Sequence, residues 1–259
     1  MPMNKPIESW QGCRVWIIGA SSGIGAALAR ALIAKGAHVA MSARNVQALS
    51  AVAAGERAQQ TLLLPLDVTR AEELVAAFER INSTWSGLDL AVFLAGSHQP
   101  VRAWELDAGA ARALVETNLI GVMNAVATLA PAFSRKSQGA IAVVSSVAGY
   151  GGLPSGLVYG ATKAALINFT ETLYLDLAPR GVGVYLVNPG FVKTPLTDKN
   201  AFKMPALISA QKAAEEMIKG FEAGVFEIHF PKRFTYWLKL LRLLPYRIYF
   251  PLIHKFTGL

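Results

Sequence analysis

The sequence predicts an α/β fold in which a doubly wound parallel sheet forms one large domain. Three features lead to this expectation: a length of 259 residues, an apolar fraction of 53% against 16% charged residues, and short β-rich apolar runs that alternate with helical segments. A chain with so much apolar surface can bury a substantial core, so intrinsic disorder is excluded as its main state. Buried strands separated by helices of ten or more residues are typical of parallel sheets.

The alternation begins with Arg14–Ile18, a β-rich apolar run, and continues into a helix over Ala26–Lys35 that Gly36 ends. Further strands are expected at Ala37–Met41, Thr61–Leu66, Leu88–Leu94, Ala140–Ser145, Val182–Val187 and Val225–Phe230. The helices expected between them cover about 45–54, 71–83, 109–134, 157–178 and 206–222. Because the composition changes only near residue 229, we divide the chain into a core domain, 1–228, and a tail, 229–259.

Positive charge is concentrated in the tail. The whole chain has a formal net charge of +8, from 25 Lys and Arg against 17 Asp and Glu. Residues 229–259 contain six of the basic residues and no acidic one, which leaves 19 basic and 17 acidic residues for the core domain, a net charge of +2. Since the tail is also aromatic and leucine-rich, it is more typical of contact with an anionic membrane than of nucleic-acid binding.

The cysteine and histidine content argues against disulfide and metal sites. Cys13 is the one cysteine, so neither an intramolecular disulfide nor a thiolate cluster can form. The four histidines are scattered, at His38, His98, His229 and His254. No metal is therefore expected. The first apolar run is too short for a signal peptide, which makes a reducing cytoplasm the expected compartment.

A glycine-rich turn lies between the first strand and the first helix. Its residues are Gly19, Ala20, Ser21, Ser22, Gly23, Ile24 and Gly25. Gly19 permits a sharp turn, Gly23 lets the backbone approach a pyrophosphate, and Gly25 lets helix and strand pack closely. The unpaired N–H groups at the helix start favour an anion, and the two serine hydroxyls add donors. An ordinary strand-to-helix turn is the alternative, but this context favours a dinucleotide site.

The end of the second strand indicates which dinucleotide binds. NAD sites usually have an acidic residue there to hold the ribose 2′-hydroxyl. Here the stretch 40–45 contains no acid but carries Arg44, whose planar fork of donors suits a 2′-phosphate, with Ser42 and Asn45 as helpers. A solvated loop arginine is the alternative. The pattern favours NADP(H) over NAD(H).

Tyr159 and Lys163 form the main catalytic candidate, because residues four apart share one face of a helix. The pKa of a free phenol is about 10, and a nearby cation lowers it. Tyr159 could then exchange a proton with a carbonyl or alcohol oxygen while hydride moves at the adjacent carbon. Ser146, at the preceding strand end, can hydrogen-bond the same oxygen and orient it, whereas Ser145 should point elsewhere.

In their order and spacing these motifs resemble the short-chain dehydrogenase/reductase family, in its common branch. The resemblance covers about residues 12–228 and depends on an ordered set of motifs. These are Gly19–Gly25, Asp67-Val68, Ala95-Gly96, Asn118, Ser146, Tyr159-x-x-x-Lys163 and Asn188-Pro189-Gly190. The family implies a Rossmann-type fold, a nicotinamide cofactor, and an oligomer that forms through the helices near 109–134 and 157–178.

The resemblance also implies roles for single residues around the adenosine half of the cofactor. Asp67 and Val68 resemble the pair that contacts adenine, and Ala95 and Gly96 resemble the motif beside the adenosine ribose. One departure is clear: the family usually has Asn-Ala-Gly here, whereas this chain has Leu94 in place of the asparagine. Since that asparagine ties neighbouring strands together, its loss concerns local rigidity more than chemistry.

Around the nicotinamide, the family implies that Asn118 interrupts a long helix and holds a water in a proton relay to Lys163, which also binds the ribose hydroxyls. Pro189-Gly190 resembles the turn under the nicotinamide, with Val192 and Thr194 near its carboxamide. Without the family, Asp67 would be read as a cap, Asn118 as a surface residue and Pro189-Gly190 as a strand end.

The substrate is expected to be an apolar carbonyl compound or alcohol, because the loops around Tyr159 are rich in apolar residues. These are His98, Tyr150, Leu153, Leu157, Phe191, Leu196, Phe202, Met204 and Leu207. The leading hypothesis is an NADP(H)-dependent oxidoreductase acting on CH–OH groups, with Asn118, Ser146, Tyr159 and Lys163 as its catalytic residues. A non-catalytic NADP(H) sensor or scaffold docked to a membrane is the alternative.

The tail can contact one of three surfaces: a membrane, the pocket of its own chain, or a partner subunit. The stretch 234–245 should form a short helix with Phe234, Trp237, Leu238, Leu241 and Leu244 along one face. It is too short and too charged to span a membrane, but it can lie in a bilayer interface on the cytoplasmic side. It can also cover the pocket as a lid or pack on a partner subunit of a homodimer or homotetramer. The sequence leaves these alternatives open.

Overall fold

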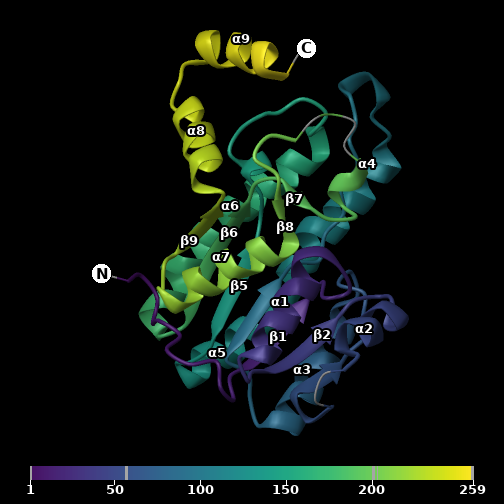
Figure 1. The fold of residues 1–259 in the computed structure, drawn as a ribbon, viewed down its shortest axis with the longest axis vertical. Helices are drawn as coiled ribbons and strands as arrows, with labels where there is room; N and C mark the ends of the chain where they lie inside the picture. Colours follow the sequence, from purple (N-terminus) through teal and green to yellow (C-terminus); the bar gives the residue numbers. More distant parts are fainter. Residues whose placement is uncertain (1, 56–57, 200–201, 203, 258–259) are drawn as a thin grey trace.

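A seven-stranded parallel sheet with helices on both faces forms the body of the computed structural model, which describes residues 2–55, 58–199, 202 and 204–257 (Figure 1). The predicted fold class is confirmed. The strand order is β3-β2-β1-β4-β5-β6-β9, and every neighbouring pair is parallel. The strands are β1 (Arg14–Ile18), β2 (His38–Ser42), β3 (Thr61–Leu63), β4 (Leu90–Phe93), β5 (Ala140–Val144), β6 (Gly183–Pro189) and β9 (Glu227–Phe230).

The direction of winding reverses between β1 and β4. The chain runs outward from β1 to β2 and β3, then returns to place β4 on the other side of β1. Loops on either side of such a switch point diverge and leave a crevice at the carboxyl ends of the strands. The glycine turn after β1 and the segment after β4 therefore border the crevice in which this class of fold binds ligands.

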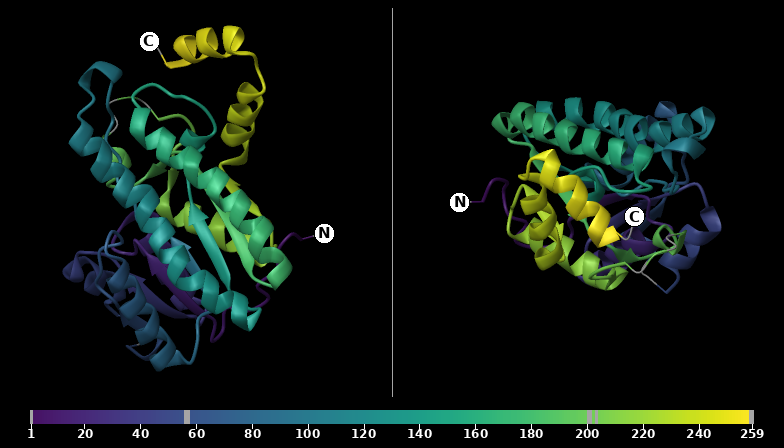
Figure 2. Two further views of the ribbon diagram at one scale, coloured as in Figure 1. Left: turned by 180° about the vertical axis from the view of Figure 1, so that it is seen from behind. Right: turned by 90° about the horizontal axis from the view of Figure 1, so that it is seen from above.

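Helices cover each face of the sheet over a separate apolar core. The helices are α1 (Gly23–Ala34), α2 (Val46–Ala53), α3 (Ala71–Trp85), α4 (Ala108–Val115), α5 (Gly121–Lys136), α6 (Leu157–Leu177) and α7 (Ala210–Glu222). One core packs α1, α2 and α7 on the sheet, through side chains such as Leu28, Leu49 and Phe221. The other packs α3, α5 and α6 on the opposite face, through Leu74, Leu129 and Leu166. The long α5 and α6 run side by side in the outer layer of that face (Figure 2).

Several elements depart from their predicted bounds, such as α1, which begins at Gly23, and three of the departures have clear local reasons. Strand β3 ends at Leu63 because Pro65 has no N–H to donate, although Leu64 still donates to the carbonyl of Met41. Helix α7 begins at Ala210, since the two residues before it form β8 (Ile208–Ser209), which pairs with β7 (Val192–Lys193). A π-helical turn, Glu116–Ile120, divides the predicted helix over 109–134 into α4 and α5.

The helical run Ala108–Lys136, which combines α4, the π turn and α5, is long and apolar enough to cross a membrane by composition alone. No other helix in the described part of the chain meets that test. Its residues Leu129 and Phe133 are fully buried against the sheet, and α5 also packs on α3. The run is therefore a core helix of the α/β layer.

The tail leaves the sheet after Phe230. Strand β9 pairs with β6 up to that residue, so the helical part of the tail begins with α8 (Lys232–Arg242). A second helix, α9 (Tyr246–Thr257), follows and includes Pro251 in its interior. The sequence analysis did not predict it, since a proline inside a helix removes one N–H donor. Helices α8 and α9 rise beyond the carboxyl ends of the strands (Figure 1).

Candidate active site

The glycine turn joins the ends of three strands. Gly19 has φ +100°, and its N–H donates to the carbonyl of Ser42 at the end of β2 over 2.7 Å. A Cβ at this position would collide with the backbone of Ala95 after β4, so only glycine fits. Helix α1 begins immediately afterwards, and the side chain of its N-cap residue Ser22 makes no capping hydrogen bond. The turn thus presents the start of a helix to an anion, as a pyrophosphate requires.

The segment after β6 lies across this turn. A Cβ on Gly23 would lie 2.9 Å from the methyl group of Thr194. Thr194 is held there by Thr197, whose hydroxyl accepts from its N–H over 3.1 Å, and Val192 is buried beneath. The structure therefore brings the predicted pyrophosphate turn and the predicted nicotinamide segment together, although they are about 170 residues apart in the sequence.

Arg44 lies exposed at the end of β2, next to Asp67. Hydrogen bonds from Thr69 lower the pKa of the Asp67 carboxyl, and the charge of Arg44 lowers it further. The two predicted helpers of Arg44 have other partners. Ser42 is fully buried and accepts the indole N–H of Trp16 over 2.8 Å, and Asn45 caps α2 by accepting from the N–H of Ala48. The expectation for Ser42 was therefore wrong, whereas Asn45 is exposed and uses only its Oδ1 in the cap, so its predicted role stays a prediction.

Val68 and Ala95 line one small hollow, beside the glycine turn, whose walls are apolar. The other residues around it are Ile18, Phe93, Thr117, Gly121 and Val122. The neighbouring Gly96 lies close to both Asn118 and Lys163, since a Cβ there would be 3.4 Å from Asn118 Oδ1 and 3.9 Å from Lys163 Nζ. The predicted adenosine residues are thus continuous in space with the catalytic candidates. Leu94, which replaces the family asparagine, packs on the core, and its N–H donates to Ile18.

Tyr159 and Lys163 lie on the buried face of α6, and Ser146 reaches them from the end of β5. Lys163 Nζ lies 5.6 Å from the centroid of the Tyr159 ring, and the Ser146 hydroxyl is near enough to the Tyr159 phenol to lower its pKa. Ser145, one residue away, donates to the carbonyl of Lys163 over 2.7 Å and belongs to the core. The sequence analysis thus predicted correctly that Ser145 points away from the Tyr159 phenol and that Ser146 is the serine on its side.

Burial dominates the electrostatics of this pair. It raises the pKa of the Tyr159 phenol, an effect that the nearby Ser146 hydroxyl opposes. It also lowers the pKa of the Lys163 ammonium from 10.5 to about 8, while Nζ donates to the carbonyl of Val144 over 2.9 Å. Near neutral pH, the Tyr159 phenol is therefore protonated and Lys163 is a buried cation.

Asn118 occupies the π-helical turn between α4 and α5 and is fully buried. Its amide brackets the backbone of Ser97: Oδ1 accepts from the Ser97 N–H over 2.7 Å, and Nδ2 donates to the Ser97 carbonyl over 2.9 Å. Nδ2 also lies 3.4 Å from Thr162 Oγ1, whose hydroxyl hydrogen-bonds the carbonyl of Tyr159. Asn118 thus links the loop after β4 to α6. Thr162 completes that link, and the sequence alone gave no signal for it.

Gly149 fixes the distance between the Ser146 loop and α6. A Cβ on Gly149 would lie 2.7–2.8 Å from the backbone of Lys163 and Ala164, closer than real Cβ contacts come. We expect Gly149→Ala to move Ser146 away from Tyr159, to destabilise the protein by about 1–3 kcal/mol and to lower kcat more than tenfold. Urea unfolding and steady-state kinetics measure both effects. Gly152→Ala, where a Cβ meets no atom within 4 Å, is the control, and equal kinetics in the two variants would contradict this role.

Aromatic side chains lie against Tyr159 and after β6, and Phe202 is 55% exposed among them. The ring of His98 lies edge-on to Tyr159 with centroids 4.6 Å apart. Phe191 contacts both Phe202 and Phe234, at 5.6 and 5.7 Å between centroids. Of the other predicted lining residues, Leu157 and Leu207 are exposed and Leu196 and Met204 are half-buried. Phe234 belongs to α8, the part of the tail for which the sequence left a pocket lid open as one of three alternatives.

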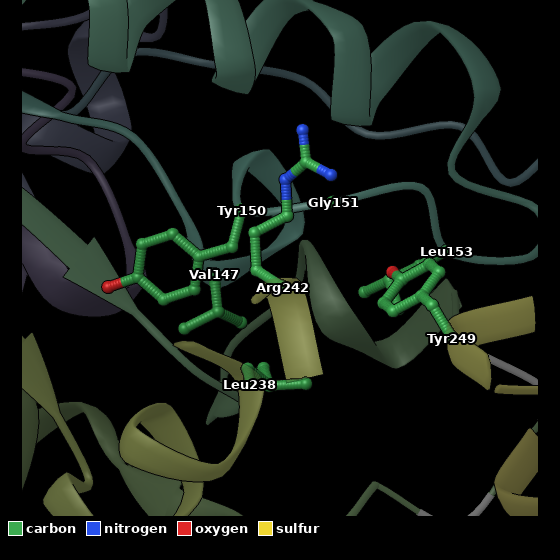
Figure 3. A pocket seen from close by; sticks show the side chains of 7 residues that line it. All are labelled: Val147, Tyr150, Gly151, Leu153, Leu238, Arg242 and Tyr249. Carbon is green, nitrogen blue, oxygen red and sulfur yellow. The ribbon is translucent and has the colours of Figure 1, made fainter. Parts of the chain in front are cut away.

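The tail also forms one wall of a small pocket beside Ser146. Its lining joins the loop after β5 to both tail helices (Figure 3) and consists of Val147, Tyr150, Gly151, Leu153, Leu238, Arg242 and Tyr249. Tyr150 is not a second acid at this site. Its phenol donates to Glu227 over 2.7 Å, and burial together with that carboxylate raises its pKa.

Comparison with known proteins identifies the family. The family model described as short chain dehydrogenase matches residues 14–204, which is more than half of the chain. This protein belongs to the short-chain dehydrogenases. An oxidoreductase of Myxococcus xanthus (strain DK1622), itself uncharacterised, is 34% identical over 231 residues, which cover 88% of this chain and 91% of the relative. The chain is therefore an oxidoreductase of this family.

Two solved short-chain dehydrogenase structures extend the comparison to bound nucleotides. A short chain dehydrogenase from Burkholderia cenocepacia J2315 in complex with NADP is 27% identical, with a TM-score of 0.77 over 90% of this chain and 93% of that one. A 3-ketoacyl-(acyl-carrier-protein) reductase from Brucella melitensis, in complex with NADH, is 25% identical, with a TM-score of 0.77 over 86% and 99%. Both dinucleotides thus occur among the structural neighbours, and the preference of this chain has to come from its own residues.

Proposed function

We propose that this protein is an NADP(H)-dependent oxidoreductase that interconverts a carbonyl group and a secondary alcohol on an apolar or lipid-like molecule. The observation that carries the proposal is the cluster of Ser146, Tyr159 and Lys163, which lies next to a helix start built for a pyrophosphate. The residues of this crevice fit a dinucleotide: a glycine that cannot carry a side chain, an apolar hollow beside it, and a buried lysine.

Each residue has a distinct role in the proposed reaction. Ser146 hydrogen-bonds the substrate oxygen and holds it against the Tyr159 phenol, which donates its proton as the oxygen gains charge. Lys163 favours the phenolate that remains and binds the nicotinamide ribose, and Asn118 supports the return of the proton. Bound NADPH would supply the hydride to the carbonyl carbon. In alcohol oxidation the proton moves in the opposite direction, from the alcohol to Tyr159.

Arg44 supports NADP(H) as the cofactor, because it is exposed at the end of β2 and no acidic residue lies within 40–45. A 2′-phosphate would find a guanidinium there, and the 2′-hydroxyl of NAD would find no carboxylate from the residues that end β2. We expect Arg44→Ala to raise the Kd of NADPH about tenfold or more and to change that of NADH less than about twofold. Fluorescence titration with both nucleotides measures this. Arg30→Ala, an exposed arginine on α1, is the control, and equal losses for both nucleotides would contradict the assignment.

The apolar substrate class is supported by the aromatic cluster of Phe191, Phe202 and Phe234 after β6, in which Phe234 packs close to Gly190. The test is NADPH oxidation with a panel of ketones that differ in chain length and charge. Higher kcat/KM for medium-chain apolar ketones such as 2-decanone than for 2-oxo acids would support the proposal. The opposite order would refute the substrate class without affecting the cofactor assignment.

We also propose that the enzyme is a homodimer or homotetramer that associates through α5 and α6. These helices run side by side on the outer face (Figure 2), and α6 carries Leu175, which is 71% exposed. Sedimentation velocity measures the assembly, and Leu175→Glu should shift it toward the monomer. A monomer at micromolar concentration in the unmodified protein would refute this proposal.

A further inference from the structure

The tail helices α8 and α9 have an outward face that no other part of the described chain covers. Its apolar side chains are large: Leu243 is 80% exposed, Phe256 73% and Trp237 66%. The remaining exposed apolar residues of these two helices are Tyr236, Leu240, Tyr246, Ile248 and Phe250. Large exposed apolar surfaces on soluble proteins usually mark binding sites. This face differs from the one expected from the sequence, since Leu238, Leu241 and Leu244 are half-buried while Tyr236 and Leu240 are exposed.

The opposite face of the same helices is anchored to the body, so the outward side chains are held in place. Lys239 forms an ion pair with Glu227, which also accepts from Tyr150. The Tyr249 phenol donates to the carbonyl of Gly152 over 2.8 Å, and Tyr249 itself is buried. A fraying or disordered tail would lack such contacts. The exposure of the outward face is therefore a property of the folded state.

The charge of the tail identifies the kind of surface that this face can meet. Lys232, Arg233, Arg247 and Lys255 are exposed, and residues 229–259 contain no acidic residue. A second copy of this face would bring basic side chains against basic side chains, which disfavours a symmetric dimer through it. Anionic lipid headgroups complement both the positive charge and the interfacial preference of Trp and Tyr.

The outward face lies at the same end of the molecule as the catalytic crevice. Figure 1 shows α9 and the segment between β4 and α4 at this end, beyond the carboxyl ends of the strands. That segment exposes Trp104 and Leu106, at 77% and 49%. A surface that contacts α8 and α9 would therefore lie near the entrance to the site.

We propose that the outward face of α8 and α9 binds the surface of an anionic lipid bilayer, with the helices in the interface and the crevice turned toward it. The apolar side chains would enter the headgroup region, and the lysines and arginines would pair with lipid phosphates. The proposal does not depend on the reaction that the site performs. It would, however, give a lipid-like substrate a short path from the bilayer to Tyr159.

The test is sedimentation of the protein with vesicles. One set contains phosphatidylcholine alone, and the other also contains about 30% of the anionic lipid phosphatidylglycerol. We expect binding to the anionic vesicles that weakens at high salt, because the interaction is partly electrostatic. Leu240→Ser with Leu243→Ser should lower the partition coefficient at least tenfold. Val75→Ser with Val225→Ser, two exposed valines on the body, should leave it unchanged.

A second set of variants separates the electrostatic contribution to vesicle binding from the apolar contribution. Arg233→Gln, Arg247→Gln and Lys255→Gln together should lower binding to anionic vesicles at least tenfold, whereas Arg135→Gln with Lys136→Gln, at the end of α5, should not. Circular dichroism and basal NADPH binding check that each variant is folded. Absence of vesicle binding, or equal losses in tail and body variants, would overturn the proposal. So would a loss of self-association, without a loss of vesicle binding, in the Leu240→Ser and Leu243→Ser variant.

Discussion

Replacing Tyr159 with Phe is expected to lower kcat/KM for carbonyl reduction about a hundred- to ten-thousandfold, which is the usual contribution of a general acid. The variant keeps the aromatic ring, and with it the contacts to His98 at 4.6 Å and to Lys163 at 5.6 Å, so the crevice should keep its shape. The Kd of NADPH should then change less than about threefold. Steady-state kinetics and fluorescence titration measure the two quantities separately.

Tyr174→Phe provides the matched control on the same helix. Tyr174 also lies on α6, but its phenol donates to the carbonyl of Met3 and faces away from the crevice. Its kinetics should match those of the unmodified protein. If Tyr159→Phe and Tyr174→Phe had the same kcat/KM, the proton donor would have to be another group.

Lys163→Met is expected to separate stability from activity. The ammonium is buried and donates to the carbonyl of Val144, and burial lowers its pKa to about 8. Since a buried charge is costly, an apolar side chain of similar length should raise the free energy of unfolding by about 1–2 kcal/mol at pH 7, after the lost hydrogen bond to Val144 is counted. The same change should lower kcat/KM about a thousandfold, because the phenolate and the ribose lose their cation.

The stability advantage of Lys163→Met should depend on pH, because Lys163 binds its proton less tightly in the folded protein than in the unfolded chain. In the unfolded chain a lysine titrates near 10.5, and in the folded protein Lys163 titrates near 8. Between these values the unfolded state binds more protons, so the stability of the unmodified protein rises with pH. The advantage of Lys163→Met should therefore be full below pH 8 and should shrink between pH 8 and 10.5. Urea unfolding at pH 7 and pH 10 tests it, and a variant less stable than the unmodified protein at pH 7 would refute the account.

The sequence predicted the fold and most of the crevice because the decisive signals are local. The glycine turn that starts at Gly19 follows a buried strand and leads into a helix, and the spacing of Tyr159 and Lys163 fits one helix face, so neither assignment needed tertiary information. The bounds of β1 agree with those predicted because its apolar run is continuous and ends at a glycine. Where a proline interrupts an apolar run, as Pro65 does, the sequence predicted the end of the strand less well, since β3 ends at Leu63 and not at Leu66.

Contacts between distant segments could not be predicted. Nothing near Phe234 in the sequence indicates that it packs on Phe191, or that Thr162 joins Asn118 to Tyr159. The position of Ser42 was misjudged for a similar reason, since its partner Trp16 lies on a neighbouring strand and its hydroxyl turns into the core. Pairings of this kind depend on strand register and helix packing, which local patterns do not specify.

The most direct test of the central claim follows the hydride in the unmodified enzyme. NADPH carrying deuterium at the transferable C4 position is mixed with an apolar ketone, and the alcohol product is examined by mass spectrometry and NMR. We expect one deuterium in the product, bonded to the carbinol carbon. We also expect the Tyr159→Phe variant to form this labelled alcohol far more slowly, although it still binds NADPH. Alcohol formed without deuterium at that carbon, or labelled product at an unchanged rate from Tyr159→Phe, would contradict it.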